Sequence, residues 1–297
     1  MKRLAGFSAA PLIAGSTTVV TQSRELGVHL PKKDIWLKGF DINRAYNEFR
    51  DLSGKVPDHN FEEFRAMYWR IDESARRAEK VLQDQGHFYL PTLDFGIYKG
   101  CAPLFSAKQM RLHYAAHHRA YVERLNKLIV GTPYDKQPLD FIIRATANDD
   151  AYKAIHNNAC QHYNHMFFWK TIHPWGSNMP PDLHDKIVEQ YGSIEKLKDA
   201  IKAAGSAHFG SGWLYWVYDS ALEKFDILTM PAAGCPLTLD GVSPLLAVDL
   251  WEHTWYVDYE NEKMKYLEKF FDVVDWHWAE RHWKRATNQH YDEMIWV

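Results

Sequence analysis

The chain has 297 residues, of which 46% are apolar and 14% aromatic, enough to fill the core of one large domain or two ordinary ones. Its net charge of −3 and isoelectric point near 6.6 give no overall basic field, which argues against nucleic acid as the main ligand. Three widely spaced cysteines suggest neither a disulfide framework nor a metal clip, and charges interrupt every apolar run before the roughly 18 residues that a membrane helix needs. We expect a globular protein from a reducing compartment, without a membrane-spanning segment.

The first 30 residues differ in composition from the rest of the chain. They are rich in Ser, Thr and Ala, carry the basic residues Lys2, Arg3 and Arg24, and contain no acidic residue before Glu25. This composition is typical of an organellar transit peptide, and it favours mitochondrial over plastid targeting. The alternative is a disordered tail. We therefore interpret residues 1–30 as a targeting-like or partner-binding segment.

Residues 31–87 are expected to form a helical N-terminal extension. Asn60 followed by Glu63 has the form of a capping box, and Gly86 supplies a stop for one long helix. Apolar residues recur at spacings of three and four between them, which predicts one buried helical face. These residues are Phe61, Phe64, Met67, Tyr68, Ile71, Ala75, Ala78 and Leu82. Packing of this face on the chain's own body is at least as well supported as packing on a partner.

Polar side chains suited to metal binding or proton transfer begin after residue 88. Residues 106–129 contain neither Gly nor Pro and are predicted to form one helix. Within about two turns this helix carries His113, His117, His118 and Tyr121. A single histidine on a helix is more often structural than a ligand, but three with a tyrosine favour a metal or proton-transfer site about as strongly as a structural role.

Two further segments embed polar groups among aromatic residues. Residues 156–175 place His162 and His165 three apart, next to Gln161 and a Phe-Phe-Trp run. The stretch VDLWEHTWYVDY sets Asp249 and His253 four apart. Burying a lone carboxylate or imidazole costs several kcal/mol unless it is paired or bound to a cation. Histidine together with carboxylate suits iron, manganese or zinc.

Spacing alone does not choose the ligands. His113 and His117 form the simplest pair on the first helix, because residues four apart lie on one helical face. Either His162 or His165 would complete the set from the second segment. The residues by themselves leave both choices open.

Several motifs in fixed order resemble the iron/manganese superoxide dismutase family. The Asp-x-Trp-Glu-His signature of that family is present in full from Asp249 to His253. The resemblance covers roughly residues 88–285 and rests on the stretches HYAAHHRAYV, NNACQHYNHMFFW, FGSGWLYWVY, AAGCPLT and PLLAVDLWEHTWYVDYEN.

The resemblance implies one metal ion per subunit with a water or hydroxide in the fifth position. The implied ligands are His113, His165, Asp249 and His253. The implied catalytic groups are Tyr121, Gln161 and His117, which would tune the bound solvent and deliver protons. The surrounding groups implied by the family are His118, Trp169, Trp213, Trp251, Glu252 and Tyr256.

The position of the glutamine favours iron over manganese. Iron-type members of the family carry this residue on the helix before the second histidine ligand, as Gln161 is here. Manganese-type members carry it in a later loop, where this chain has Ala233. The resemblance also implies a homodimer, or a heterodimer with a related subunit. In that dimer Glu252 reaches the metal-bound His253 of the partner subunit and Tyr256 approaches His117 across the interface.

The resemblance implies an α+β fold in which an N-terminal helical hairpin domain is followed by an α/β domain with a small antiparallel sheet. The expected boundaries are 88–178 for the hairpin, 179–285 for the metal-binding α/β domain and 286–297 for a C-terminal extension. The expected function is superoxide disproportionation at a mononuclear iron site in mitochondria. The two extensions are candidates for docking the enzyme on a larger mitochondrial complex. The alternative is a structural subunit of such an assembly, a ribosome or a respiratory complex, with little or no activity.

Overall fold

The computed structural model of the chain describes residues 88–93 and 95–287, all within one compact unit. The expected segments 1–30 and 31–87 lie outside the described residues. So do residues 288–297 of the expected C-terminal extension. Within the described part, no helix combines the length and the apolar character that a membrane crossing requires.

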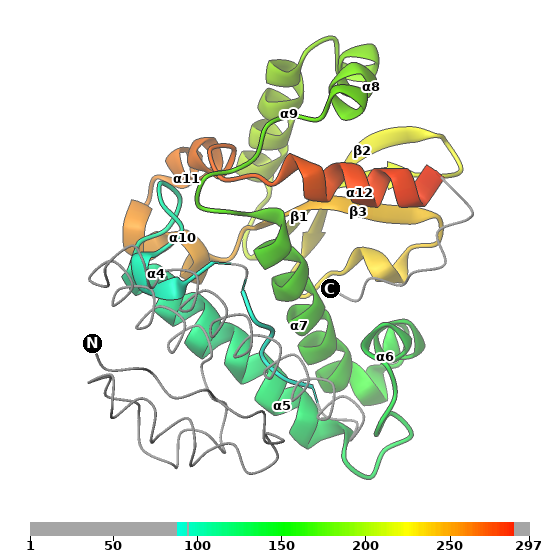
Figure 1. Cartoon of the computed structure of the whole chain (residues 1–297). Helices are drawn as coiled ribbons and strands as arrows, with labels where there is room; N and C mark the ends of the chain where they lie inside the picture. Colours follow the sequence, from blue (N-terminus) through cyan, green and yellow to red (C-terminus); the bar gives the residue numbers. More distant parts are fainter. Residues whose placement is uncertain (1–87, 94, 288–297) are drawn as a thin grey trace, which may run out of the picture. The chain divides into compact units, whose positions relative to one another are not determined.

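A helical half comes first along the chain, and a small sheet with further helices follows it (Figure 1). The elements before the sheet are η4 (Ile97–Lys99), α4 (Ala107–Leu112), η5 (His113–His118), α5 (Arg119–Ile129), α6 (Leu139–Thr146), η6 (Asp150–Tyr152), α7 (Lys153–Thr171), α8 (Pro181–Tyr191) and α9 (Ile194–Ala207). The remaining elements are β1 (Gly212–Asp219), β2 (Lys224–Pro231), η7 (Pro236–Thr238), β3 (Val242–Asp249), α10 (Glu252–Tyr259), α11 (Lys263–Phe270) and α12 (Trp276–Thr287). This order confirms the predicted α+β fold.

The helix predicted over 106–129 is continuous but not uniform. Ser106 caps it, because its hydroxyl accepts a hydrogen bond from the backbone N–H of Gln109 at 3.1 Å. The middle of the helix, η5, is a π-helical segment that carries three histidines and opens with His113. Such wider turns are rare and are frequent at functional sites. The prediction of one helix over these residues is therefore confirmed, but the segment that bears the histidines is wound more widely than an α-helix.

The helical hairpin consists of α5 and α7, which pack against each other. A shorter helix, α6, lies between them in the chain and packs on α7, and the sequence did not predict it. The described chain begins beside α5. The backbone N–H of Phe88 donates to the side-chain oxygen of Asn126 at 2.9 Å, and the Asn126 amide donates to the carbonyl of Phe88 at 2.7 Å. These two bonds fix the start of the described chain onto the hairpin.

The sheet has three antiparallel strands in the order β2-β1-β3. The central strand β1 is buried over its first seven residues, as expected for a strand covered on both faces. Its register sets Trp213 opposite Asp249, so the start of β1 and the last residue of β3 meet at one end of the sheet. Helices α7 and α12 both pack on β3 (Figure 1). This packing brings α7 of the hairpin to the end of β3.

Candidate metal centre

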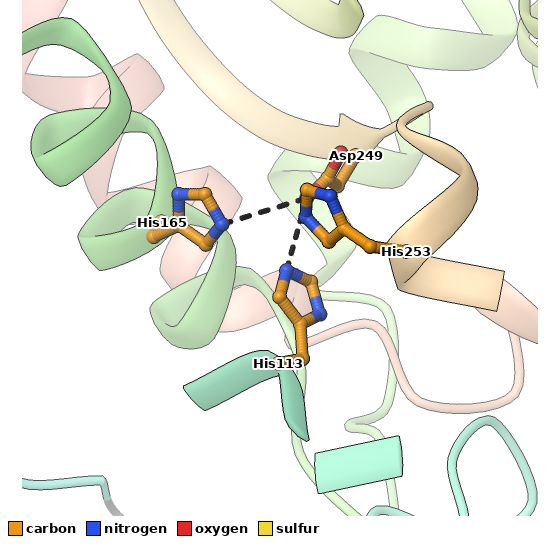
Figure 2. A group of neighbouring side chains, drawn as sticks. All are labelled: His113, His165, Asp249 and His253. Carbon is orange, nitrogen blue, oxygen red and sulfur yellow. Dashed lines mark hydrogen bonds and ion pairs between the residues drawn. The ribbon is translucent and has the colours of Figure 1, made fainter. Parts of the chain in front are cut away.

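Four side chains from four different elements meet at one point. His113 opens the π-helical segment η5, His165 lies on α7, Asp249 ends β3 and His253 lies in the first turn of α10. One ligand atom from each lies within 4.8 Å of all the others. Figure 2 shows the three imidazole rings and the carboxylate turned toward a common centre. We refer to these four residues as the metal centre.

One carboxylate oxygen of Asp249 is a close neighbour that all three imidazole rings of the metal centre share. Oδ2 of Asp249 lies 3.0 Å from Nε2 of His113, and 3.7 Å from Nε2 of both His165 and His253. The other oxygen, Oδ1, accepts the backbone N–H of Trp251 at 2.9 Å. That bond comes from the turn between β3 and α10. It leaves Oδ2 directed at the three imidazoles.

Burial sets the charges in the metal centre. Desolvation lowers the pKa of His113 to about 4 and holds the pKa of His165 well below its usual range, so both rings are neutral at neutral pH. Burial acts to raise the pKa of Asp249, but its hydrogen bond with His113 and its interaction with the nearby His253 ring outweigh this effect and hold that pKa below its usual range. The site therefore combines three imidazoles with one carboxylate charge. Neutral imidazole and ionised carboxylate are the forms that bind a metal ion.

The donor set fits a first-row metal ion. Nε2 of His165 and Nε2 of His253 are buried without a hydrogen-bond partner among the described residues. Buried polar atoms normally have a partner, so two such atoms aimed at one carboxylate oxygen call for a cation between them. The structure thus brings together the four implied ligands. The group that could hold an ion contains His113 and His165, and neither His117 nor His162 belongs to it.

A backbone contact sets the tautomer of His165. Its Nδ1 lies 2.6 Å from the carbonyl oxygen of Gln161, one turn earlier on α7, so Nδ1 donates and Nε2 stays free for a metal. The Gln161 side chain is buried, and its Oε1 accepts the indole N–H of Trp213 at 3.1 Å. This bond fixes which way the amide points.

Tyr121 and His117 lie next to the ligand rings. The Tyr121 ring is 5.3 Å from the His165 ring, and burial with the nearby Asp249 charge raises the pKa of Tyr121 to about 12. His117 stacks on His253, with ring centres 4.1 Å apart, and is exposed on its other side. His117 therefore links the ligand ring of His253 to solvent, and Tyr121, which is partly buried, packs beside His165.

Three tryptophans surround the metal centre. Trp169 lies 4.7 Å from the His113 ring, Trp213 lies 5.0 Å from His165, and Trp251 lies 5.6 Å from His253, measured between ring centres. Trp213 is fully buried, whereas Trp251 is partly exposed and donates its indole N–H to the carbonyl of Ala232. These rings exclude water from three sides.

The residues implied for a dimer contact lie at the surface. Glu252 and Tyr256 project from α10, and about half of the Tyr256 side chain is exposed. His253, which lies between them in sequence, keeps 13% of its side chain exposed. The same helix thus carries a ligand and two exposed side chains.

Sequence reasoning missed two side chains that hold the ligand-bearing backbone. The Gln109 amide donates to the carbonyls of His253 and Thr254, at 2.7 and 2.5 Å, and so joins α4 to α10. The Tyr266 hydroxyl donates to the carbonyl of Asp249 at 3.0 Å. Neither residue stands out in sequence, because each acts on backbone groups more than 15 positions away.

Comparisons with known proteins agree with this arrangement. Residues 87–173 match the family model for the alpha-hairpin domain of iron/manganese superoxide dismutases, and residues 179–282 match the model for the C-terminal domain. The chain is 39% identical over 198 residues to a superoxide dismutase [Fe] of Coxiella burnetii, and the alignment covers 66% of this chain and 98% of that protein. It is 40% identical over 190 residues to a superoxide dismutase [Fe] of Salmonella typhimurium, covering 64% of this chain and 94% of that protein. A superoxide dismutase [Fe] of Synechocystis is 37% identical over 191 residues, with coverage of 64% and 94%.

The matched regions contain all four residues of the metal centre and all the elements that carry them. Both domain models match in the order in which the helical and α/β halves occur in the fold. The chain therefore belongs to the iron/manganese superoxide dismutase family.

Proposed function

We propose that the protein is a superoxide dismutase that holds one iron ion at His113, His165, Asp249 and His253. The observation that carries this proposal is the meeting of three imidazoles and one carboxylate, within 4.8 Å, from four elements of the fold. The curated relatives that match over nearly their whole length are superoxide dismutases [Fe]. When bound, the iron would supply the one-electron couple through which two superoxide ions become dioxygen and peroxide.

The chain's own residues would set the charge and exclude water. The single carboxylate of Asp249 neutralises only part of a trivalent ion's charge, so the site would attract a small anion. Trp169, Trp213 and Trp251 lower the local dielectric and strengthen the electrostatic interactions inside the site. His165 is held ready to ligate by its bond to the Gln161 carbonyl.

Protons would come from the side that faces solvent. Tyr121, with a pKa near 12, keeps its hydroxyl proton at neutral pH and can act as a hydrogen-bond donor next to the site. His117 stacks on His253 and is exposed, so it is an ionisable group that can exchange protons with solvent beside a ligand. The Trp213 indole holds Oε1 of Gln161, which leaves the amide N–H groups of Gln161 free to act toward the centre.

Iron is favoured over manganese by the origin of the buried amide. Gln161 on α7 supplies it, and Ala233, in the loop after β2, has no polar side chain to offer in its place. The expectation from the sequence and the names of the relatives point to the same ion. Metal analysis of the purified protein tests this choice directly.

A dimer is supported by the surface of α10. Glu252 and Tyr256 are exposed there, adjacent to His253, whose edge also reaches the surface. We propose that a second copy, or a related subunit, covers this face so that Glu252 reaches the partner's metal centre. Sedimentation of the wild type and of Glu252→Ala tests the contact, with dissociation expected for the variant.

Mitochondrial localisation is supported by the composition of residues 1–30 alone. A fluorescent fusion of these residues should accumulate in mitochondria, and a fusion that stays in the cytosol would refute the proposal. The match to relatives leaves about a third of this chain uncovered while spanning nearly all of theirs. That uncovered third favours a second candidate function, in which the protein is a subunit of a larger mitochondrial assembly.

Purification of the native protein separates the two candidates. Bound iron together with superoxide consumption supports the enzyme, whether or not the protein is docked on a complex. A stable position in a large complex without iron or turnover supports the structural subunit. Superoxide consumption must disappear in His165→Ala if the enzyme proposal holds.

A further inference from the structure

His162 was a candidate ligand on spacing, and the metal centre does not use it. Its side chain is nevertheless buried, with 2% exposed, on the same helix as the ligand His165. Nδ1 of His162 lies 2.9 Å from Nε2 of His118. His118 is fully buried as well, and its ring stacks on the His165 ring at 5.0 Å with an interplanar angle of 20°.

The hydrogen bonds of His118 have a fixed direction. The indole N–H of Trp169 can only donate, and it lies 3.0 Å from Nδ1 of His118, so that nitrogen carries no proton. A neutral His118 must then carry its proton on Nε2 and donate it to Nδ1 of His162. His162 in turn must be protonated on Nε2. The chain of donors therefore runs from Trp169 through His118 to His162.

Both imidazoles are held in the neutral form that this direction requires. Both rings are buried, so the charged form of either would lose its hydration. A proton on Nδ1 of His162 would face the N–H of His118 across 2.9 Å. His162 also makes a T-shaped ring contact with Phe88, at 5.8 Å between ring centres. Phe88 is itself tied to α5 through Asn126.

We propose that His162 is a positioning residue for the metal centre: as the acceptor for His118, it fixes the ring that packs on the ligand His165. The inference rests on the proposed function, because it concerns the same site. Without this acceptor, the buried Nε2–H of His118 has no partner, and the His118 ring must turn or flip to find one. The His118 ring that stacks on His165 would then lose its fixed orientation.

The variants separate hydrogen bonding from packing. His162→Val removes the acceptor, whereas His162→Asn keeps an acceptor, because its Oδ1 takes the place of Nδ1. Both variants lose the imidazole ring, so a difference between them reports the hydrogen bond. Thr171→Val is the matched control on the same helix. It removes a buried hydroxyl that accepts the Ala247 N–H at 3.3 Å and donates to the Phe167 carbonyl at 3.0 Å.

Nitrogen NMR of histidine-labelled, metal-free full-length protein gives the first readout. In the wild type we expect an unprotonated Nδ1 and a protonated Nε2 for His118, and the opposite tautomer would overturn the proposal even if no variant folds. His162→Val should shift the signals of His118 and His165. His162→Asn should restore them, and Thr171→Val should leave them unchanged.

Iron retention and the electron paramagnetic resonance spectrum of iron(III) give the second readout. Loss of a group hydrogen-bonded to a metal ligand typically costs about 10- to 100-fold in metal affinity. His162 acts one residue further out, so His162→Val should lose iron to a chelator at most about 10-fold faster. His162→Asn should stay near the wild-type rate and spectrum. Equal defects in both His162 variants, or a His162→Val protein that behaves like Thr171→Val, would overturn the proposal. Iron binding without superoxide turnover in the wild type would refute the proposed function, while the nitrogen signals still decide the role of His162.

Discussion

Within the part of the chain that the structure describes, imidazole nitrogens without hydrogen-bond partners are buried in the metal centre and in a second region, and the second region lacks the ligand set of a metal site. In the metal centre, the unpartnered nitrogens of His165 and His253 both point to the Asp249 carboxylate. At the other region, which we call the α12 cluster, the buried nitrogens of Trp278, His282 and Trp283 lack partners among the described residues. These three lie along a single helix.

The comparison shows that convergence, rather than burial, distinguishes a ligand from a core histidine. Burial lowers the pKa of His113 to about 4. The pKa of His282 is lowered to about 3, mainly by burial and to a smaller extent by the nearby arginines. Both rings are therefore neutral at pH 7. Indole nitrogens are donors only and cannot bind a cation. Across residues 88–93 and 95–287, the metal centre is the one group of three or more His, Cys, Asp or Glu side chains whose ligand atoms lie close enough to share an ion.

Removing one ligand is expected to have the largest effect and tests this distinction directly. His165→Ala should abolish iron binding and superoxide consumption, because one of four ligands is lost and the Asp249 charge is left less compensated. His282→Ala is the matched control from the α12 cluster. It should keep full iron content and turnover while losing stability. Metal analysis and a superoxide assay on both proteins check the prediction, and iron loss in His282→Ala would break the comparison.

Removing the iron should destabilise the wild type by the next largest amount. A ligand that binds only the folded state stabilises it by about 4 kcal/mol at a thousand times its dissociation constant. Urea unfolding with and without a chelator measures this difference. The chelator should have no effect on His165→Ala, since that variant has no ion to lose. A wild type that is indifferent to the chelator would mean that the four side chains tolerate burial without a cation.

Gln109→Leu should cost about 2 kcal/mol, because it removes the donor of two backbone carbonyls next to the metal centre. The control is Gln190→Leu, which also breaks two hydrogen bonds, both to the backbone of Phe225, but at an exposed position. Urea unfolding of the metal-free proteins should show the larger loss for Gln109→Leu. Equal losses would contradict a special role for the link between α4 and α10.

Much of the metal centre was predictable because its ligands lie within local motifs. The stretch around Asp249 and His253 combines a strand end and a helix start in five residues, so both ligands follow from one signature. The choice between His162 and His165 was not predictable from spacing. Residues three apart share a helical face only roughly, and the packing of α7 decides which ring turns to β3 and which turns to His118.

The fold was predictable in its order of elements and less so in its detail. Strands β1 and β2 follow from apolar runs bounded by turn residues, and α9 from its periodic apolar face and its Ser193 cap. The π-helical turn that opens at His113 and the short helix α6 were missed. A π-turn depends on tertiary contacts, and propensity does not separate it from an ordinary helix. Gln109 was missed for a similar reason, because its partners are backbone groups of a distant helix.

The smallest expected effect concerns the pH dependence of the α12 cluster. The pKa of His282 is about 3 in the folded protein and near 6.5 when unfolded, so between these values the unfolded chain binds one more proton. His282 therefore costs stability as pH falls below about 6.5, and its contribution is neutral above that pH. Between pH 7.5 and pH 5.5 this loss should reach about 1 kcal/mol.

Replacing the ring with a phenyl group isolates this contribution. His282 lies between Phe167 and Trp278, at 5.1 and 4.3 Å from their ring centres, so His282→Phe keeps aromatic packing and removes the titrating nitrogen. Urea unfolding at pH 7.5 and 5.5 should show that the variant loses less stability on acidification than the wild type does. An unchanged pH dependence would mean that His282 can take up a proton within the folded protein. The α12 cluster would then lie open to solvent, and the contrast with the buried, charge-paired metal centre would be one of exposure rather than of convergence.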